Sequence, residues 1–146
     1  MKTSDNTIVI TGGGSGIGAA LAHRLHDLGN TVIIAGRRMS ALEKAVGNRP
    51  NMHALILDQD DPASIAAFAQ RLVADFPATN VLVNNAGIMR MEGSLAARRD
   101  LSDAEASVTS NLLGPIRLID ALVEHLGKHR TPPSSTSAPV SPSCRW

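Results

Sequence analysis

The sequence predicts an α/β protein with a parallel sheet, and two observations support this class. Short β-branched runs alternate along the chain with stretches whose apolar residues recur at helical spacing. The first run, Ile8–Ile10, leads at once into the glycine cluster TGGGSGIG at residues 11–18 and then into a helical pattern. A buried strand, a tight turn and a helix N-terminus are therefore expected in succession, and right-handed crossovers would order the strands 3-2-1-4.

The expected elements follow in chain order. The first helix ends at Gly29, and its apolar stripe consists of Ile17, Leu21, Leu25 and Leu28. Next come a strand at 31–35, a helix at 40–46 closed by Gly47, a strand at 52–57, a helix at 62–76 and a strand at 81–83. Asp61 and Pro62 predict the start of the 62–76 helix, because aspartate caps helix N-termini and proline fits the first helical turn.

A long helix is expected after a polar, irregular connection at 88–100. Ser102 and Glu105 form a capping box at its start. One apolar stripe consists of Val108, Leu112, Ile116, Ile119, Val123 and Leu126, and it is widened toward a second face by Leu113, Leu118 and Leu122. A helix that is apolar on two sides requires both the sheet and a further partner.

The composition argues against several classes of function. The chain has 146 residues, a formal net charge of +1 and one cysteine, Cys144. We expect a single cytoplasmic domain that binds neither nucleic acid nor membranes, because the chain has no basic tract, no leader-like start and no long apolar run. A lone cysteine forms no intrachain disulfide and no cysteine-cluster metal site, so no metal is expected.

The glycine cluster has a chemical use beyond the turn. Glycine permits positive φ and close backbone approach, and the free amides at a helix start favour an anion. Gly12, Gly16 and Gly18 form T-G-x-x-x-G-x-G, and the looser pattern G-x-G-x-x-A is also present at 14–19. The expected ligand is a diphosphate, and the alternative is a turn that merely requires glycine.

Four motifs stand in one order: TGGGSGIG, Leu57-Asp58, NNAG at 84–87, and Asn111 in the long helix. Together they closely resemble the short-chain dehydrogenase/reductase family, and AGRR, NNAGIMR and NLLGPIRL are similar to its DltE-type oxidoreductases. The resemblance covers roughly residues 6–127 and implies a Rossmann-like doubly wound parallel sheet, here truncated after the fourth strand and the long fifth helix. Residues 1–130 would form the NAD(P)-binding domain and residues 131–146 a disordered tail.

The resemblance also implies an activity and a site. The family transfers hydride between nicotinamide and a small-molecule carbonyl or alcohol, and its members are homo-oligomers. The glycine turn would hold the diphosphate and its ribose, Asp58 the adenine amino group, and the NNAG segment the adenosine ribose. The cofactor residues so implied are Gly12, Ser15, Gly16, Ile17, Gly18, Asp58, Asn85, Ala86 and Gly87. Taken singly, Asp58 could instead be a strand-end cap and Asn84-Asn85 a turn.

The end of the second strand predicts NADP rather than NAD. A carboxylate there would bind the ribose 2′-hydroxyl of NAD and repel a 2′-phosphate. This position is Gly36, followed by Arg37 and Arg38, whose guanidinium groups suit a phosphate. The alternative is a pair of solvated arginines in a loop.

Asn111 corresponds to the catalytic asparagine of the family, whose backbone carbonyl holds a proton-relay water. Pro115 lies four residues on and has no N–H for that carbonyl, so we expect a kink that leaves the carbonyl available. The rest of the catalytic pattern is missing. The sequence contains no tyrosine, so the family's Tyr-x-x-x-Lys centre is absent, and no histidine stands at a predicted strand end.

Two functions of different classes therefore stay open. The first is an NADP-dependent oxidoreductase that is cut short and inactive in this form. The second is a non-catalytic nucleotide-binding or interaction module, which would bind a dinucleotide without turnover. An extended epimerase/dehydratase relative is disfavoured, because that branch usually has T-G-x-x-G-x-x-G. Self-association is expected through the edge of the fourth strand and the second face of the long helix.

We predict that the tail from Thr131, which holds four of the eight prolines, is an out-of-frame translation. When the reading frame starts two bases later, the bases TC of a TCN serine codon become the last two bases of a new codon. Such a codon encodes Phe, Leu, Ile or Val. One choice of synonymous codons for residues 130–146 then reads HAAIVNVSSGLAFVPL, a strand followed by the serine pair that the family pattern requires. The alternative is a Pro/Ser-rich tail. Sequencing the locus decides between the two explanations of the tail. An intact downstream frame that contains Tyr-x-x-x-Lys supports the frameshift, and a downstream region without this motif contradicts it.

Overall fold

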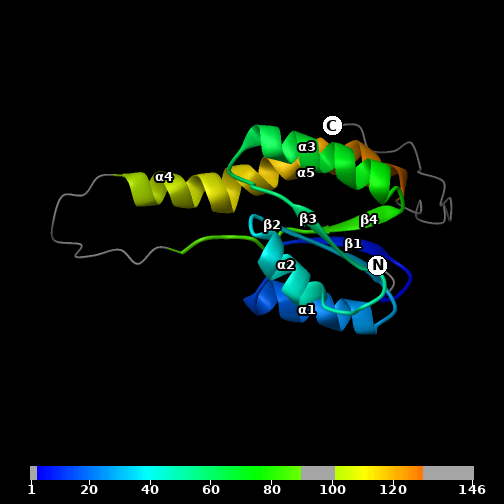
Figure 1. The fold of residues 1–146 in the computed structure, drawn as a ribbon. Coiled ribbons are helices and arrows are strands. Elements are labelled where there is room, and N and C mark those ends of the chain that lie inside the picture. The colour runs from blue at the N-terminus through cyan, green and yellow to red at the C-terminus, as the bar shows by residue number, and fades with distance from the viewer. Residues whose placement is uncertain (1–2, 90–100, 130–146) are drawn as a thin grey trace, which may run out of the picture.

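The computed structural model describes residues 3–89 and 101–129, which form one parallel sheet with helices on both faces (Figure 1). The elements are β1 (Thr7–Thr11), α1 (Gly16–Asp27), β2 (Thr31–Gly36), α2 (Met39–Val46), β3 (Met52–Ile56), α3 (Pro62–Asp75), β4 (Thr79–Val83), α4 (Ser102–Val108), the π-helical turn η1 (Thr109–Leu113) and α5 (Gly114–Lys128). Up to β4 the predicted elements are present, with bounds that differ by one or two residues. Most of the predicted irregular connection, and the tail from 131, lie outside the described residues.

The sheet has the predicted strand order, β3-β2-β1-β4, with every described pair parallel. The register aligns Thr11 with Ala35 and Gly36 with Ile56, so the carboxyl ends of the first three strands meet at one edge. The β1–β4 pairing shifts register between Thr7 and Ile8. The doubly wound α/β fold predicted from the sequence is therefore confirmed.

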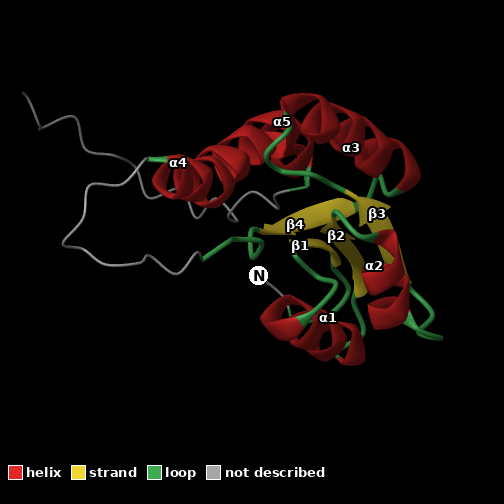
Figure 2. Ribbon diagram, turned by 60° about the vertical axis from the view of Figure 1, so that its left-hand side comes forward, coloured by secondary structure: helices red, strands yellow, loops and turns green. Residues whose placement is uncertain are grey.

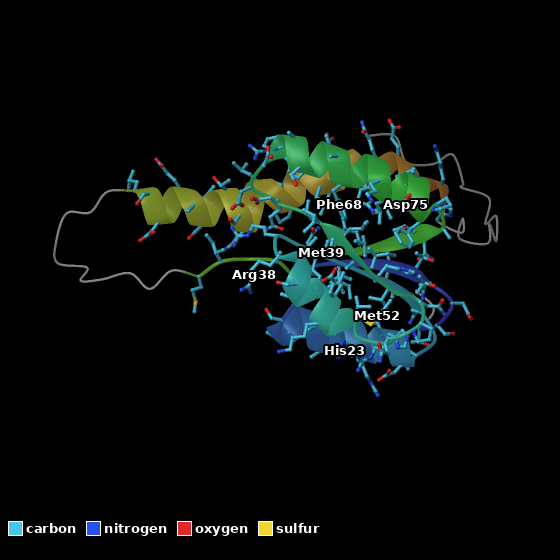
Figure 3. The ribbon with its side chains drawn as sticks, viewed as in Figure 1. His23, Arg38, Met39, Met52, Phe68 and Asp75 are labelled. Atoms are coloured by element: carbon cyan, nitrogen blue, oxygen red, sulfur yellow. The ribbon has the colours of Figure 1, made fainter. Side chains whose placement is uncertain are left out.

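Alternation along the strands divides the core into two layers. Val9 and Ile33 pack on one face beneath α3 and α5, with Phe68 and Leu72 of α3. The opposite set packs against α1 and α2, and its strand members are Ile8, Ile10, Val32 and Ile34. Figure 2 shows the sheet between these two pairs of helices, and in Figure 3 Phe68 and Met52 lie on opposite sides of it. The central strands β1 and β2 are rich in β-branched residues, as expected where both faces of a sheet are buried.

The predicted apolar stripe of α1 is partly wrong. Ile17 is 81% exposed and Leu28 is also exposed, whereas the fully buried positions of the helix are Gly18 and Ala22. Small residues occupy the buried face because α1 packs close against the sheet. Leu21 and Leu25 are half-buried against the same core layer.

The long helix differs from its prediction in which face meets the sheet. Leu118 and Leu122, assigned to the secondary face, are fully buried against the core. The predicted main stripe lies outside instead: Val108, Leu112, Ile116, Ile119 and Val123 are each about half exposed. The expectation that this helix is apolar on two sides is correct, and its second face is open among the described residues.

The start and middle of this helix also need correction. Leu101 is the N-cap and Ser102 the first helical residue, so the helix begins one residue earlier than the predicted capping box requires. The disturbance expected from Pro115 takes the form of the π-turn η1, in which the Gly114 N–H donates to the Thr109 carbonyl five residues back. Among residues 3–89 and 101–129, no helix has the length and apolar character needed to cross a bilayer.

Candidate functional site

A pocket of about 470 Å³ opens at the carboxyl edge of the sheet, the edge where open α/β sheets bind ligands. Ten of the predicted cofactor residues line it: Gly12, Ser15, Ile17, Gly18, Arg37, Arg38, Asp58, Asn85, Ala86 and Gly87. Gly16 and Asn111 were also predicted for the site, but neither lines the pocket. Figure 3 shows Arg38 and Met39 at the start of α2, at this edge.

The glycine turn brings β1 and α1 closer together than side chains would permit. Gly12 has a φ of +69°, and its N–H donates to the Ala35 carbonyl at 2.8 Å. A Cβ added at Gly18 would collide with the Gly12 carbonyl oxygen and would lie 2.5 Å from Asn85 Nδ2. Glycine is therefore required at position 12 by the backbone conformation and at position 18 by close approach.

The first turn of α1 offers its backbone amides to a ligand. Ser15 is the N-cap, yet its side chain caps no amide, and the first turn contains no acidic residue. Such amides carry partial positive charge and attract anions. Gly16 has a φ of +56°, and a Cβ there would meet nothing within 4 Å, so glycine serves the backbone conformation at this position.

The loop after β2 forms a basic side of the pocket. Arg37 and Arg38 are exposed, and neither forms an ion pair within the described ranges. A Cβ at Gly36 would meet only Leu42 Cδ2, at an ordinary contact distance of 3.6 Å. The strand end therefore has room for a larger side chain but carries no acid, and two cations stand beside it.

The loop after β3 contributes four residues, Leu57–Asp60, and of these only Asp58 was predicted to contact the cofactor. The Asp58 N–H donates to Ser64 Oγ at 2.9 Å, and its Oδ1 accepts from the Asp60 N–H at 3.1 Å. Asp60 Oδ1 accepts from the Ser110 hydroxyl at 2.5 Å. Gln59, also missed, is buried between this loop and η1.

The NNAG segment is joined to β1 through Thr11, a pocket residue that the sequence analysis did not single out. The buried Thr11 hydroxyl accepts from the N–H of Asn85 at 3.0 Å and from the N–H of Ala86 at 2.9 Å. Asn85 Nδ2 donates to the Thr11 carbonyl at 3.0 Å. A threonine at the end of a buried strand, at the first position of the glycine cluster, was the available signal.

Asn111 stands in η1, and its side chain binds the backbone of Ile88. Its Nδ2 donates to the Ile88 carbonyl and its Oδ1 accepts from the Ile88 N–H, both at 2.8 Å. Both Ile88 and Ser110 line the pocket and were missed, because their positions depend on contacts between distant segments. The role predicted for the Asn111 backbone carbonyl stays a prediction.

The described histidines lie away from the pocket, as the sequence analysis expected. Burial lowers the pKa of His125, and the neighbouring His129 and Lys128 lower it further. The ring of His125 stands 5.0 Å from that of His129 near the end of α5, at the side of the molecule opposite α4 (Figure 1). No group of three metal-binding side chains occurs among residues 3–89 and 101–129.

Comparisons with known proteins agree with this geometry. The family model of the short chain dehydrogenases matches residues 6–131. The uncharacterized oxidoreductase DltE of Bacillus subtilis is 38% identical over 128 residues, which cover 88% of this chain and 51% of that protein. The chain thus spans about half the length of this curated relative.

Solved structures have the same fold. The 3-ketoacyl-(acyl-carrier-protein) reductase of Brucella melitensis, complexed with NADH, has a TM-score of 0.79 at 25% identity, over 87% of this chain and 52% of that one. The F189W actinorhodin polyketide ketoreductase with NADPH has a TM-score of 0.74 at 25% identity, over 86% of this chain and 49% of that one. These two neighbours hold nicotinamide dinucleotides of both kinds.

We predict that Gly18→Ala destabilises the protein, whereas Gly14→Ala does not. A Cβ at Gly18 collides with the backbone of Gly12, which cannot move without breaking its bond to Ala35. A Cβ at Gly14 meets Ala41 Cβ at 3.4 Å, an ordinary contact. The expected loss for Gly18→Ala is about 1–3 kcal/mol in the free energy of unfolding, measured by urea denaturation. Equal stability of the two variants would contradict the close-approach argument.

Proposed function

This chain belongs to the short-chain dehydrogenase family of oxidoreductases, and from that premise we propose that its pocket binds NADP(H). The observation that carries the proposal is the open N-terminus of α1, which lines the same pocket as the basic loop after β2 and the acidic loop after β3. Family members act on small molecules, and we propose a carbonyl or alcohol as the substrate of the whole enzyme.

The residues present fit the parts of such a cofactor. The uncapped first turn of α1 suits the diphosphate, because several amides and the Ser15 hydroxyl can donate to its oxygens. Asp58 suits the adenine amino group, since a carboxylate accepts from amines. Asn85–Gly87 would contact a ribose, in a segment that Thr11 holds rigid.

The choice of NADP over NAD rests on charge. A 2′-phosphate beside Gly36 would meet two guanidinium groups that no carboxylate neutralises among the described residues. The pocket's carboxylates, Asp58 and Asp60, follow β3 instead of β2. An anionic phosphate is therefore favoured over a hydroxyl at the end of β2.

The chain by itself is proposed to bind the dinucleotide without turning over a substrate. Bound nicotinamide supplies hydride transfer, but these 146 residues contain no tyrosine to hold or release the matching proton in the way the family resemblance implies. The same observation supports a second candidate, a non-catalytic dinucleotide-binding module. The two candidates differ in whether further sequence at the locus encodes the missing centre.

We predict that Gly36→Asp combined with Arg37→Ala reverses the preference for NADP(H) over NAD(H). The aspartate fits at position 36 and would repel the 2′-phosphate while accepting from a 2′-hydroxyl. A change in the Kd ratio of about 100-fold corresponds to one or two charge-assisted hydrogen bonds. Equilibrium titration measures this ratio, and Arg24→Ala on the exposed surface of α1 is the matched control.

An NADPH oxidation assay with a panel of carbonyl compounds completes the test. We expect binding and no oxidation above the rate without protein. Unchanged selectivity in the double variant would contradict the NADP assignment, and turnover by the 146-residue chain would contradict the proposed inactivity.

We also propose that the chain self-associates through the exposed face of α4, η1 and α5. This face presents five large apolar side chains, and continuous patches of this kind drive association. Ile116→Gln with Val123→Gln should lower the average molar mass measured by light scattering. Ile56→Gln on β3, an exposed isoleucine outside this face, is the control. A monodisperse monomer for the unsubstituted chain would contradict the proposal.

A further inference from the structure

The π-turn creates a buried carbonyl that the helix itself cannot satisfy. In η1 the Gly114 N–H donates to the Thr109 carbonyl, five residues back. The next bond of this pattern would join residue 115 to the Ser110 carbonyl, but residue 115 is proline and has no N–H. Ser110 is only 2% exposed, so its carbonyl requires a donor from elsewhere in the protein.

Gln59 supplies that donor from the loop after β3. Its Nε2 donates to the Ser110 carbonyl at 2.7 Å and to the Ala86 carbonyl at 3.2 Å. One side-chain amide therefore joins the β3 loop to η1 and to the loop after β4. The side chain is 8% exposed, and the reversed amide would place its oxygen against two carbonyl oxygens, so only one orientation is favourable.

Neighbouring contacts keep these segments close. The Ser110 hydroxyl donates to Asp60, beside Gln59. A Cβ at Gly114 would lie 2.8 Å from the Gln59 carbonyl oxygen, so the start of α5 packs directly on this loop. The adjacent Asn111 side chain pairs with both backbone groups of Ile88. The position of η1 thus sets the position of the pocket wall at 86–88.

We infer that Gln59 is a positioning residue for the pocket wall at 86–88, which would contact the ribose of the adenosine half of the dinucleotide. The pocket runs from Arg37 and Arg38 after β2, past the α1 N-terminus, to the wall at 86–88 after β4. A ligand whose 2′-phosphate binds the arginines and whose adenine lies at Asp58 would place its adenosine ribose against this wall. Gln59 holds the wall through Ala86 directly and through Ser110 and Asn111 indirectly. The inference rests on the proposed function, because it names the ligand as NADP.

The test compares NADP⁺ with 2′,5′-ADP, which contains only the adenosine half and the 2′-phosphate. In Gln59→Met, which keeps the side-chain length but removes the donors, the Kd for NADP⁺ should rise about tenfold. The Kd for 2′,5′-ADP should rise by a similar factor, because this ligand contains the adenosine ribose. The ratio of the Kd values for NAD⁺ and NADP⁺ should change less than twofold, because the arginine side of the pocket is untouched. Gln70→Met, at an exposed position on α3, is the matched control and should change neither Kd.

A second measurement needs no ligand. The Ile88 amide is held by Asn111, so its hydrogen exchange, followed by NMR, should be faster in Gln59→Met by about tenfold and unchanged in Gln70→Met. Unchanged Kd values for both ligands, an altered ratio of the Kd values for NAD⁺ and NADP⁺, or unchanged Ile88 exchange in a folded variant would overturn the positioning role. Gln59→Glu, of the same shape but facing two carbonyl oxygens, should reproduce the exchange result, and a protected Ile88 in it would count against the role. If the unsubstituted chain binds neither ligand, the proposed function fails, while the Ile88 exchange still decides whether Gln59 positions the wall.

Discussion

The close approach of the first turn of α1 to the end of β1 is the contact on which the site depends. Gly12 bends the chain through a positive φ, and Gly18 leaves no side chain between the helix and the Gly12 carbonyl. The same contact brings Asn85 of the β4 loop against both segments. A helix N-terminus is thereby fixed over the sheet edge, where its amides face the pocket instead of the core.

Burial on both faces of the sheet leaves its carboxyl edge as the place where polar groups gather. The strands are apolar inside the two core layers, and polar residues follow each strand where it ends. Thr11 is an exception in that it is fully buried, and its hydroxyl and carbonyl are both hydrogen-bonded to the β4 loop. This bonding offsets the cost of burying a polar side chain and makes the edge rigid.

The two sides of the pocket are built differently. The side at the end of β2 consists of adjacent residues in one loop, so its charge can be read directly from Gly36, Arg37 and Arg38. The side at 86–88 depends on a π-turn, on Gln59 from a third segment and on the glycine that admits α5 beside it. One group of residues therefore sets the charge of the pocket at the end of β2, and a separate group sets the position of the pocket wall at 86–88.

Local sequence by itself determined the strand order, the glycine turn and part of the pocket lining, because these follow from short patterns and from the handedness of crossovers. It identified Asp61 as a helix cap and Gly29 and Gly47 as helix ends, each of which depends on the backbone of neighbouring residues.

Only the tertiary structure decided which face of α5 meets the sheet, because both faces of this helix are apolar. Leu118 and Leu122 are the residues that pack against α3 and the sheet. The tertiary structure also decided how the helix accommodates Pro115, namely through the π-turn η1. In the π-turn, Pro115 leaves the Ser110 carbonyl without a helical donor, and Gln59, which lies 51 residues earlier, donates to it. Periodicity cannot reveal such a contact, because the two residues are brought together only when the helix packs on the sheet.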